Sequence, residues 1–219
     1  MISSFDPLGA LFFAVSVVPA MVIHELAHGW MAIRFGDHSP RFAGRMTPNP
    51  TQHIDPFGSI VLPGLLLLPV LFGRPGFAFG YAKPMPVNRA TLSNPDRQVV
   101  WIALAGVVAN LVLALAGALA YRFLAPLGPD VVDRFLRIWV FTNVLMGIVH
   151  VMPVPPLDAS RMLAPFLPGR ARTVYESWEP YGGLFMLAVF FILPGPFLAI
   201  VGAVVEGLFG ILLGGTGVG

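Results

Sequence analysis

A long, mainly apolar stretch from Leu8 to Phe35 is the feature that most limits how this chain folds. About twenty apolar residues suffice for a helix to cross the roughly 30 Å hydrocarbon core of a bilayer. Gly36, Asp37 and Pro40 follow the stretch, and residues of these types usually mark the end of a helix. The stretch therefore predicts a first membrane helix.

The composition supports a membrane protein. Hydrophobic residues make up 56% of the chain and charged residues only 11%, whereas about a quarter of the residues in a soluble domain are charged. The formal net charge of +2 comes from scattered side chains, which gives no support to a nucleic-acid partner. The chain has no cysteine, so any bound metal must be held by His, Asp or Glu.

Further apolar stretches predict more membrane segments, and they cover Arg97–Phe123, Arg134–Met152, Ser59–Phe72 and Tyr181–Leu213. Prolines interrupt Ser59–Phe72, which either crosses a thinned region or re-enters without spanning. Pro194-Gly195-Pro196 divides the last stretch, which is either a hairpin or one broken helix.

Two proline-containing polar segments lie between the first membrane helices. Thr47–Pro56 and Phe77–Asn88 suggest short strands or extended loops. The expected fold is an all-α polytopic membrane protein, with four to six membrane helices and short β-strand or re-entrant segments around a buried site. It forms one domain over residues 1–219, with a core at about 8–161 and a C-terminal membrane segment at about 181–213.

The sequence His24-Glu25-Leu26-Ala27-His28 lies inside the first predicted helix. Residues four apart share a helix face, so His24 and His28 can both direct an imidazole nitrogen at one ion. This is the H-E-x-x-H pattern, in which two histidines bind zinc and the glutamate accepts a proton from water. The bland alternative is a set of structural polar groups, but ionisable residues are costly at membrane depth and are functional by default.

A catalytic zinc needs three protein ligands and one open position. Most remaining carboxylates lie in apparent loops between helices. Asp158 differs, because it follows the proline-rich turn Pro153-Val154-Pro155-Pro156 at the end of a predicted membrane helix. Such a stiff turn can carry a carboxylate to membrane depth, although an aspartate here also suits a simple helix N-cap.

Several separated motifs together resemble the site-2 protease family of intramembrane zinc metalloproteases, particularly its small prokaryotic members. They are His24–His28, Asn49–Pro56, Ala82–Asn88, Ala103–Gly106 with Asn110, and Pro153–Asp158. The resemblance implies that Asp158 is the third ligand of a single Zn²⁺ ion, beside His24 and His28. The small prokaryotic members that the chain resembles further imply a multi-pass protein of a prokaryotic cell membrane, whose substrates are transmembrane segments of regulatory proteins.

Two departures from the family pattern affect the predicted site. His150 stands where relatives commonly have an asparagine that helps to hold substrate or the developing oxyanion, and Ala159 replaces the glycine after the aspartate. We hypothesise that His150 is catalytic and donates a hydrogen bond to the tetrahedral intermediate. The alternatives are that His150 is a fourth metal ligand or a structural histidine at the helix end. Asn143 lies seven residues before His150, on a similar helix face, and is a weaker substitute for the missing asparagine.

The predicted mechanism assigns Glu25 as the general base that later delivers its proton to the leaving amine. His53 is expected at most to support a metal ligand through a hydrogen bond, without binding the metal itself. The two strand-like segments are expected to pair with an unwound substrate as an added strand. Rival functions are a membrane transporter that binds a metal in transit and an inactive relative that only binds membrane partners.

Overall fold

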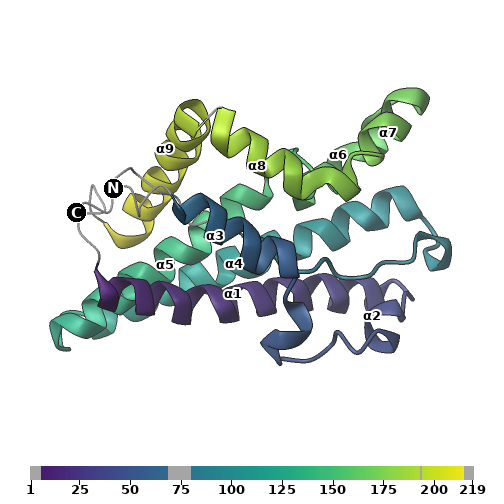
Figure 1. The fold of residues 1–219 in the computed structure, drawn as a ribbon. Coiled ribbons are helices and arrows are strands. Elements are labelled where there is room, and N and C mark those ends of the chain that lie inside the picture. The colour runs from purple at the N-terminus through teal and green to yellow at the C-terminus, as the bar shows by residue number, and fades with distance from the viewer. Residues whose placement is uncertain (1–5, 69–79, 193, 215–219) are drawn as a thin grey trace.

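The computed structural model describes residues 6–68, 80–192 and 194–214, and across these ranges the regular structure is entirely helical. Three long helices lie side by side along the molecule: α1 (Pro7–Arg34), α4 (Pro95–Leu124) and α5 (Asp130–His150) (Figure 1). Each of the three contacts the other two. The sequence predictions of these helices are confirmed, with their ends shifted by a few residues.

Proline and small polar residues define where the long helices begin. Pro7 and Pro95 occupy the first turns of α1 and α4, where the missing N–H leaves no helix bond broken. The Asn94 side chain also accepts a hydrogen bond from the Arg97 N–H at 3.4 Å. After α1, Gly36 adopts a φ of 91°, which favours glycine and turns the chain away from the helix.

Within the described ranges, two helices are long and apolar enough to cross a membrane, α1 and α4. Their outer faces carry apolar side chains, for example Leu11 and Val15 on α1 and Val112 and Leu119 on α4. Contiguous apolar surface of this kind suits a lipid or protein environment better than water. The larger number of spans, four to six, stays a prediction, as does the single-domain organisation.

The predicted strands do not form in the described residues. In the segment 47–56 the chain instead makes the 3₁₀ helix η1 (Pro50–His53), and the π-helix η2 (Pro56–Val61) follows. The reason is side-chain capping: Asn49 accepts from the Thr51 N–H at 3.1 Å, and Asp55 accepts from the Gly58 N–H at 2.6 Å. Such local bonds compete with a strand ladder.

The second predicted strand is an isolated extended segment. Residues 77–79 lie outside the described part of the chain, and residues 80–88 run extended without regular structure. Tyr81 donates its N–H to Gly58 O at 3.0 Å, and Lys83 donates to His53 O at 2.8 Å. Pro84 and Pro86 have no N–H, so the pairing cannot continue as a ladder. We call residues 80–88 the extended segment.

Shorter helices complete the fold, namely α2 (Ser39–Phe42), α3 (Leu62–Leu67), η4 (Arg89–Thr91), α6 (Asp158–Leu163), η5 (Ala164–Phe166), α7 (Gly169–Glu176), η6 (Glu179–Tyr181), α8 (Gly182–Ile192) and α9 (Pro194–Leu213). In Figure 1, α8 and α9 are separate helices that meet at an angle, so the last apolar stretch is broken near Pro194 as expected. The re-entrant prediction for 59–72 falls on η2 and α3, and residues 69–72 lie outside the described ranges.

The main hydrophobic core joins the middle of the long helices to the C-terminal helices. Its buried members include Ala114 of α4, Val140 and Val144 of α5, Met186 of α8 and Val205 of α9. A smaller cluster, containing Ala32 and Ile102, closes the end of α1 against α4. The helices α1, α4, α5 and α6 also carry buried polar residues, among them His24, Asn110, Asn143 and Asp158.

Candidate metal centre

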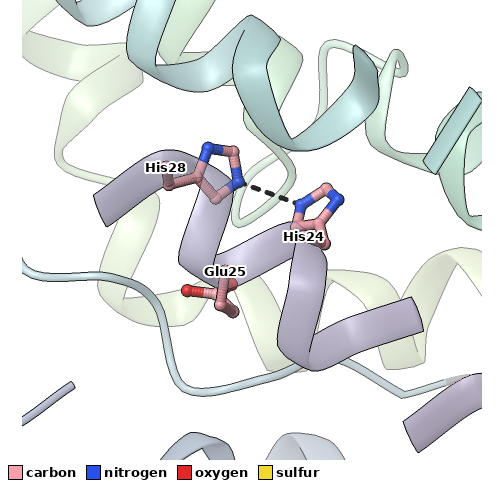
Figure 2. Close-up of side chains that lie close together, drawn as sticks. All are labelled: His24, Glu25 and His28. Carbon is pink, nitrogen blue, oxygen red and sulfur yellow. Dashed lines mark hydrogen bonds between the residues drawn. The ribbon is translucent and has the colours of Figure 1, made fainter. Parts of the chain in front are cut away.

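His24 and His28 lie one helical turn apart on α1 and are almost completely buried, with exposed fractions of 1% and 4%. Their Nε2 atoms are 2.9 Å apart. Figure 2 shows the two imidazole rings turned toward each other on one side of the helix, while the Glu25 carboxylate leaves it on another side. The predicted shared face of His24 and His28 is therefore what the structure forms.

Asp158, 130 residues after His28 in the sequence, reaches the same point. Its Oδ2 lies 2.9 Å from His24 Nε2, and its Oδ1 lies 3.3 Å from His28 Nε2. Leu157 occupies the N-cap position of α6, and no side chain caps that helix. The alternative interpretation of Asp158 as an N-cap is wrong, because its carboxylate faces the two histidines instead.

The second nitrogen of each imidazole is held by α4. His28 Nδ1 donates to the backbone Ile102 O at 2.7 Å, and His24 Nδ1 donates to Asn110 Oδ1 at 2.5 Å. Because both partners are acceptors, each Nδ1 carries a proton, and in a neutral imidazole Nε2 then presents a lone pair. Asn110 Nδ2 in turn donates to Asn143 Oδ1 at 3.3 Å, which links α1 through α4 to α5.

The donor set fits a zinc ion. Two imidazole lone pairs and a carboxylate face one another at 2.9–3.3 Å, and no hydrogen-bond donor lies between them in their neutral imidazole form. Atoms that bind a tetrahedral zinc at 2.0–2.2 Å lie roughly 3.3 Å from one another. A shared cation would thus relieve the repulsion of these three acceptors and would leave one coordination position open.

The close approach of α4 depends on Gly106. A Cβ atom at this position would lie 2.5 Å from His28 Nε2 and 2.7 Å from His24 Cε1. Ile102, Gly106 and Asn110 follow one another at intervals of four, so they form one face of α4. On this face, Ile102 offers its carbonyl to His28, Asn110 offers its amide oxygen to His24, and Gly106 leaves room for both rings.

His150, at the C-terminal end of α5, contacts the site through Asp158. Its Nδ1 lies 2.8 Å from Asp158 Oδ2, and its ring centroid is 4.3 Å from that of His24. One nitrogen, Asp158 and His24 together place potential ligand atoms within 4.8 Å of one another. The structure brings His150 to the centre, and its three predicted roles stay hypotheses.

Glu25 completes the group from the side of α1. Its carboxylate and the two imidazoles offer ligand atoms within 4.8 Å of one another, and the side chain is buried. Among the described residues, Glu25 Oε2 is one of two buried side-chain atoms without a hydrogen-bond partner. An unpaired carboxylate oxygen beside the two histidines is free to accept a proton.

Comparison with known proteins supplies the family. The chain is 32% identical over 195 residues to "Putative zinc metalloprotease YwhC" of Bacillus subtilis (strain 168), covering 82% of this chain and 84% of YwhC. The chain belongs to this zinc metalloprotease family. Members named "Putative zinc metalloprotease Rip2" are more distant: that of Mycobacterium tuberculosis (strain ATCC 25618 / H37Rv) is 28% identical over 172 residues.

The Rip2 proteins are longer than the matched region. The matches cover 78% of this chain but 63% of the Mycobacterium tuberculosis protein and 62% of the one from Mycolicibacterium smegmatis (strain ATCC 700084 / mc(2)155), which is 31% identical. No protein-family model and no solved structure matches the chain.

A cavity of about 250 Å³ adjoins the candidate metal centre at His28 and Asp158. Apolar side chains such as Met85 and Ile102 contribute to its lining. Charged side chains do so as well, and among these Arg89 pairs with Glu176 at 2.8 Å. The candidate centre is thus buried, yet it borders a cavity with both apolar and charged lining.

Sequence reasoning did not assign roles to three groups at the centre. Asn110 was part of the family resemblance, and a lone amide in an apolar helix was a usable signal. Gly106 belongs to the same motif, and the motif alone gives it no role. Arg45 was missed entirely, although it is buried and lies 4.0 Å from Glu25. His53, predicted to act behind the ligands, lies beside Arg45 rather than beside the histidines.

Proposed function

We propose that this chain is an intramembrane zinc metalloendopeptidase of the site-2 protease type, which cleaves regulatory membrane proteins in or near their transmembrane segments. One observation carries the proposal: the Asp158 carboxylate lies within 3.3 Å of His24 and His28 of the apolar helix α1, with Glu25 beside them. The zinc metalloprotease family supports the chemistry. The length and apolar outer faces of α1 and α4 support the membrane location.

The chain's residues divide the work of peptide hydrolysis. His24, His28 and Asp158 would hold Zn²⁺, which when bound lowers the pKa of water toward neutrality and polarises a carbonyl. Glu25 accepts a proton from the attacking water through its unpaired oxygen and returns it to the leaving amine. Asn110 and the Ile102 carbonyl keep both imidazoles in the tautomer that binds metal.

His150 has two roles in this proposal. Its Nδ1–H donates to Asp158 Oδ2 and thereby orients the carboxylate between the two histidines. Its other nitrogen is the proposed donor to the oxyanion that develops on the substrate, a role that requires the imidazolium form, in which both ring nitrogens carry hydrogen. His150→Ala is expected to lower turnover with zinc still bound, whereas loss of the metal would make His150 a ligand or an essential support of Asp158.

The substrate must unwind before cleavage, because a helix hides its peptide bonds in internal hydrogen bonds. We propose that the unwound substrate lies along the extended segment, whose residues Met85 and Val87 border the cavity beside His28. Main-chain pairing of this kind is a general way to bind an extended peptide.

The deciding experiment compares the wild type with Glu25→Gln in detergent, with zinc content and cleavage of a transmembrane substrate measured on the same samples. Equal zinc and lost cleavage are expected, because glutamine keeps the shape but accepts no proton. Glu206→Gln makes the same chemical change on α9 and should leave both quantities unaltered. Normal cleavage by Glu25→Gln refutes the proposal, and zinc flux into vesicles without any cleavage favours a transporter.

A further inference from the structure

Arg45 is a buried cation in the loop between α2 and η1, with only 4% of its surface exposed. Its Nη2 donates to the backbone Lys83 O at 2.6 Å, and its Nη1 donates to Pro84 O at 3.4 Å. A buried guanidinium is costly unless it is well bonded. These two bonds attach Arg45 to the extended segment and fix the plane of its guanidinium.

The same guanidinium faces the Glu25 carboxylate. Arg45 Nη2 lies 4.0 Å from Glu25 Oε2, which is within range of charge attraction but beyond a hydrogen bond. Glu25 Oε2 and Arg45 Nε are the buried side-chain atoms that lack a hydrogen-bond partner in the described part of the chain. The pair thus keeps its attraction while the carboxylate oxygen keeps a free lone pair.

A direct salt bridge would place Glu25 differently. Hydrogen bonds from a guanidinium would occupy the carboxylate oxygens that must accept a proton. With Arg45 held back by two backbone carbonyls, the charge orients the carboxylate without taking its lone pairs. This geometry suits a general base that has to exchange a proton in each catalytic cycle.

His53 supports Arg45 from behind. Its Nε2–H donates to Thr47 O at 2.9 Å, so the lone pair is on Nδ1, which lies 3.5 Å from Arg45 Nη2. His53 is completely buried. The imidazole therefore limits where the guanidinium can move and acts on the arginine rather than on a metal ligand.

We infer that Arg45 is the positioning residue of Glu25, anchored by Lys83 O and Pro84 O and supported by His53. The inference rests on the proposed peptidase function and assigns a role to a side chain outside the metal-binding motif. It separates two tasks at one site: α4 orients the metal ligands, and Arg45 orients the base.

The test measures kcat, KM and zinc content for Arg45→Met and for the milder Arg45→Lys, with a transmembrane substrate in detergent. A base displaced by about 1 Å loses on the order of a hundredfold in rate. We expect Arg45→Met to lower kcat by about that factor, with KM and zinc unchanged. Arg45→Lys keeps the charge but cannot hold both carbonyls, so we expect an intermediate kcat.

A second background shows whether the effect passes through Glu25. Glu25→Asp retracts the carboxylate from Arg45, so adding Arg45→Met to Glu25→Asp should lower kcat by less than about threefold, since coupled residues are not additive. Arg137→Met, on the half of α5 far from His150, is the matched control and should behave like the wild type.

The outcomes separate this inference from the proposed function. An equal fall in both backgrounds, a raised KM with normal kcat, or unchanged kinetics overturns the role of Arg45. Loss of zinc or of the folded state in both Arg45→Met and Arg45→Lys also overturns it, because the role is then structural. If Glu25→Gln itself cleaves normally, the proposed peptidase mechanism falls.

Discussion

Gly106→Ala is the smallest change that should remove the metal while keeping the fold. The new methyl group would meet His28 Nε2 at 2.5 Å, whereas ordinary contacts begin at 3.4 Å. One imidazole must therefore move by roughly 1 Å, and zinc–ligand distances tolerate only about 0.2 Å. In the middle of a helix, alanine is more favourable than glycine by about 1 kcal/mol, so the substitution should not destabilise α4.

The expected magnitude follows from what the displaced ring does. Substitutions that merely loosen the partners behind a ligand reduce metal affinity by about 10–100-fold. Gly106→Ala acts on both ligands directly, since it also approaches His24 Cε1 at 2.7 Å. We expect at least about a hundredfold loss of zinc affinity, which corresponds to about 2.7 kcal/mol.

The assay is a competition titration with a zinc-binding dye on protein purified in detergent, with helix content followed by circular dichroism. Gly147→Ala on α5 is the matched control, because its methyl group would meet Leu111 at an ordinary 3.4 Å. Zinc affinity of Gly106→Ala within about threefold of the wild type would show that the α1–α4 contact is not what shapes the centre.

Two further predictions concern the surroundings of the site. Asn110→Leu should lower zinc affinity by about 10–100-fold with the fold retained, measured by the same titration, because His24 loses its 2.5 Å partner. Burial raises the pKa of Asp37, but hydrogen bonds from Ser39 and Asn88 outweigh it and lower that pKa below its usual value. Stability from Asp37 is therefore complete above the ordinary carboxyl pKa and disappears as pH falls through the lowered one, a dependence that Asp37→Asn should abolish in thermal unfolding.

The long helices and the shared face of His24 and His28 could be predicted because each rests on a strong local signal. In hydrocarbon, a single apolar segment can satisfy its own backbone hydrogen bonds only as a helix. Two residues four positions apart then lie on the same face of that helix. The position of Asp158 needed the family resemblance as well, since spacing alone left the N-cap interpretation open.

The prediction of strands was wrong because proline-rich polar segments carry two opposing signals. Alternating residues suggest a strand, but Asn49 and Asp55 each stand before a proline and cap a helical turn instead. The position of Arg45 could not be predicted for a different reason. Its partners are backbone carbonyls and a carboxylate from other parts of the chain, and only tertiary packing brings them together.

The polar groups around the centre are satisfied on one side and unsatisfied on the other, and this asymmetry matches what each side must do. From His24 through Asn110 and Asn143 to the Trp139 carbonyl, each amide or imidazole donor meets an acceptor, so the ligands are held in fixed orientation. In the proposed function His24 binds the metal, and such partners keep a ligand in the orientation that the metal needs. Within the described residues, the unpaired buried atoms belong to Glu25 and Arg45. A base that gives up and regains a proton needs such a free position, because a carboxylate already saturated with hydrogen bonds would have to break one before it could act.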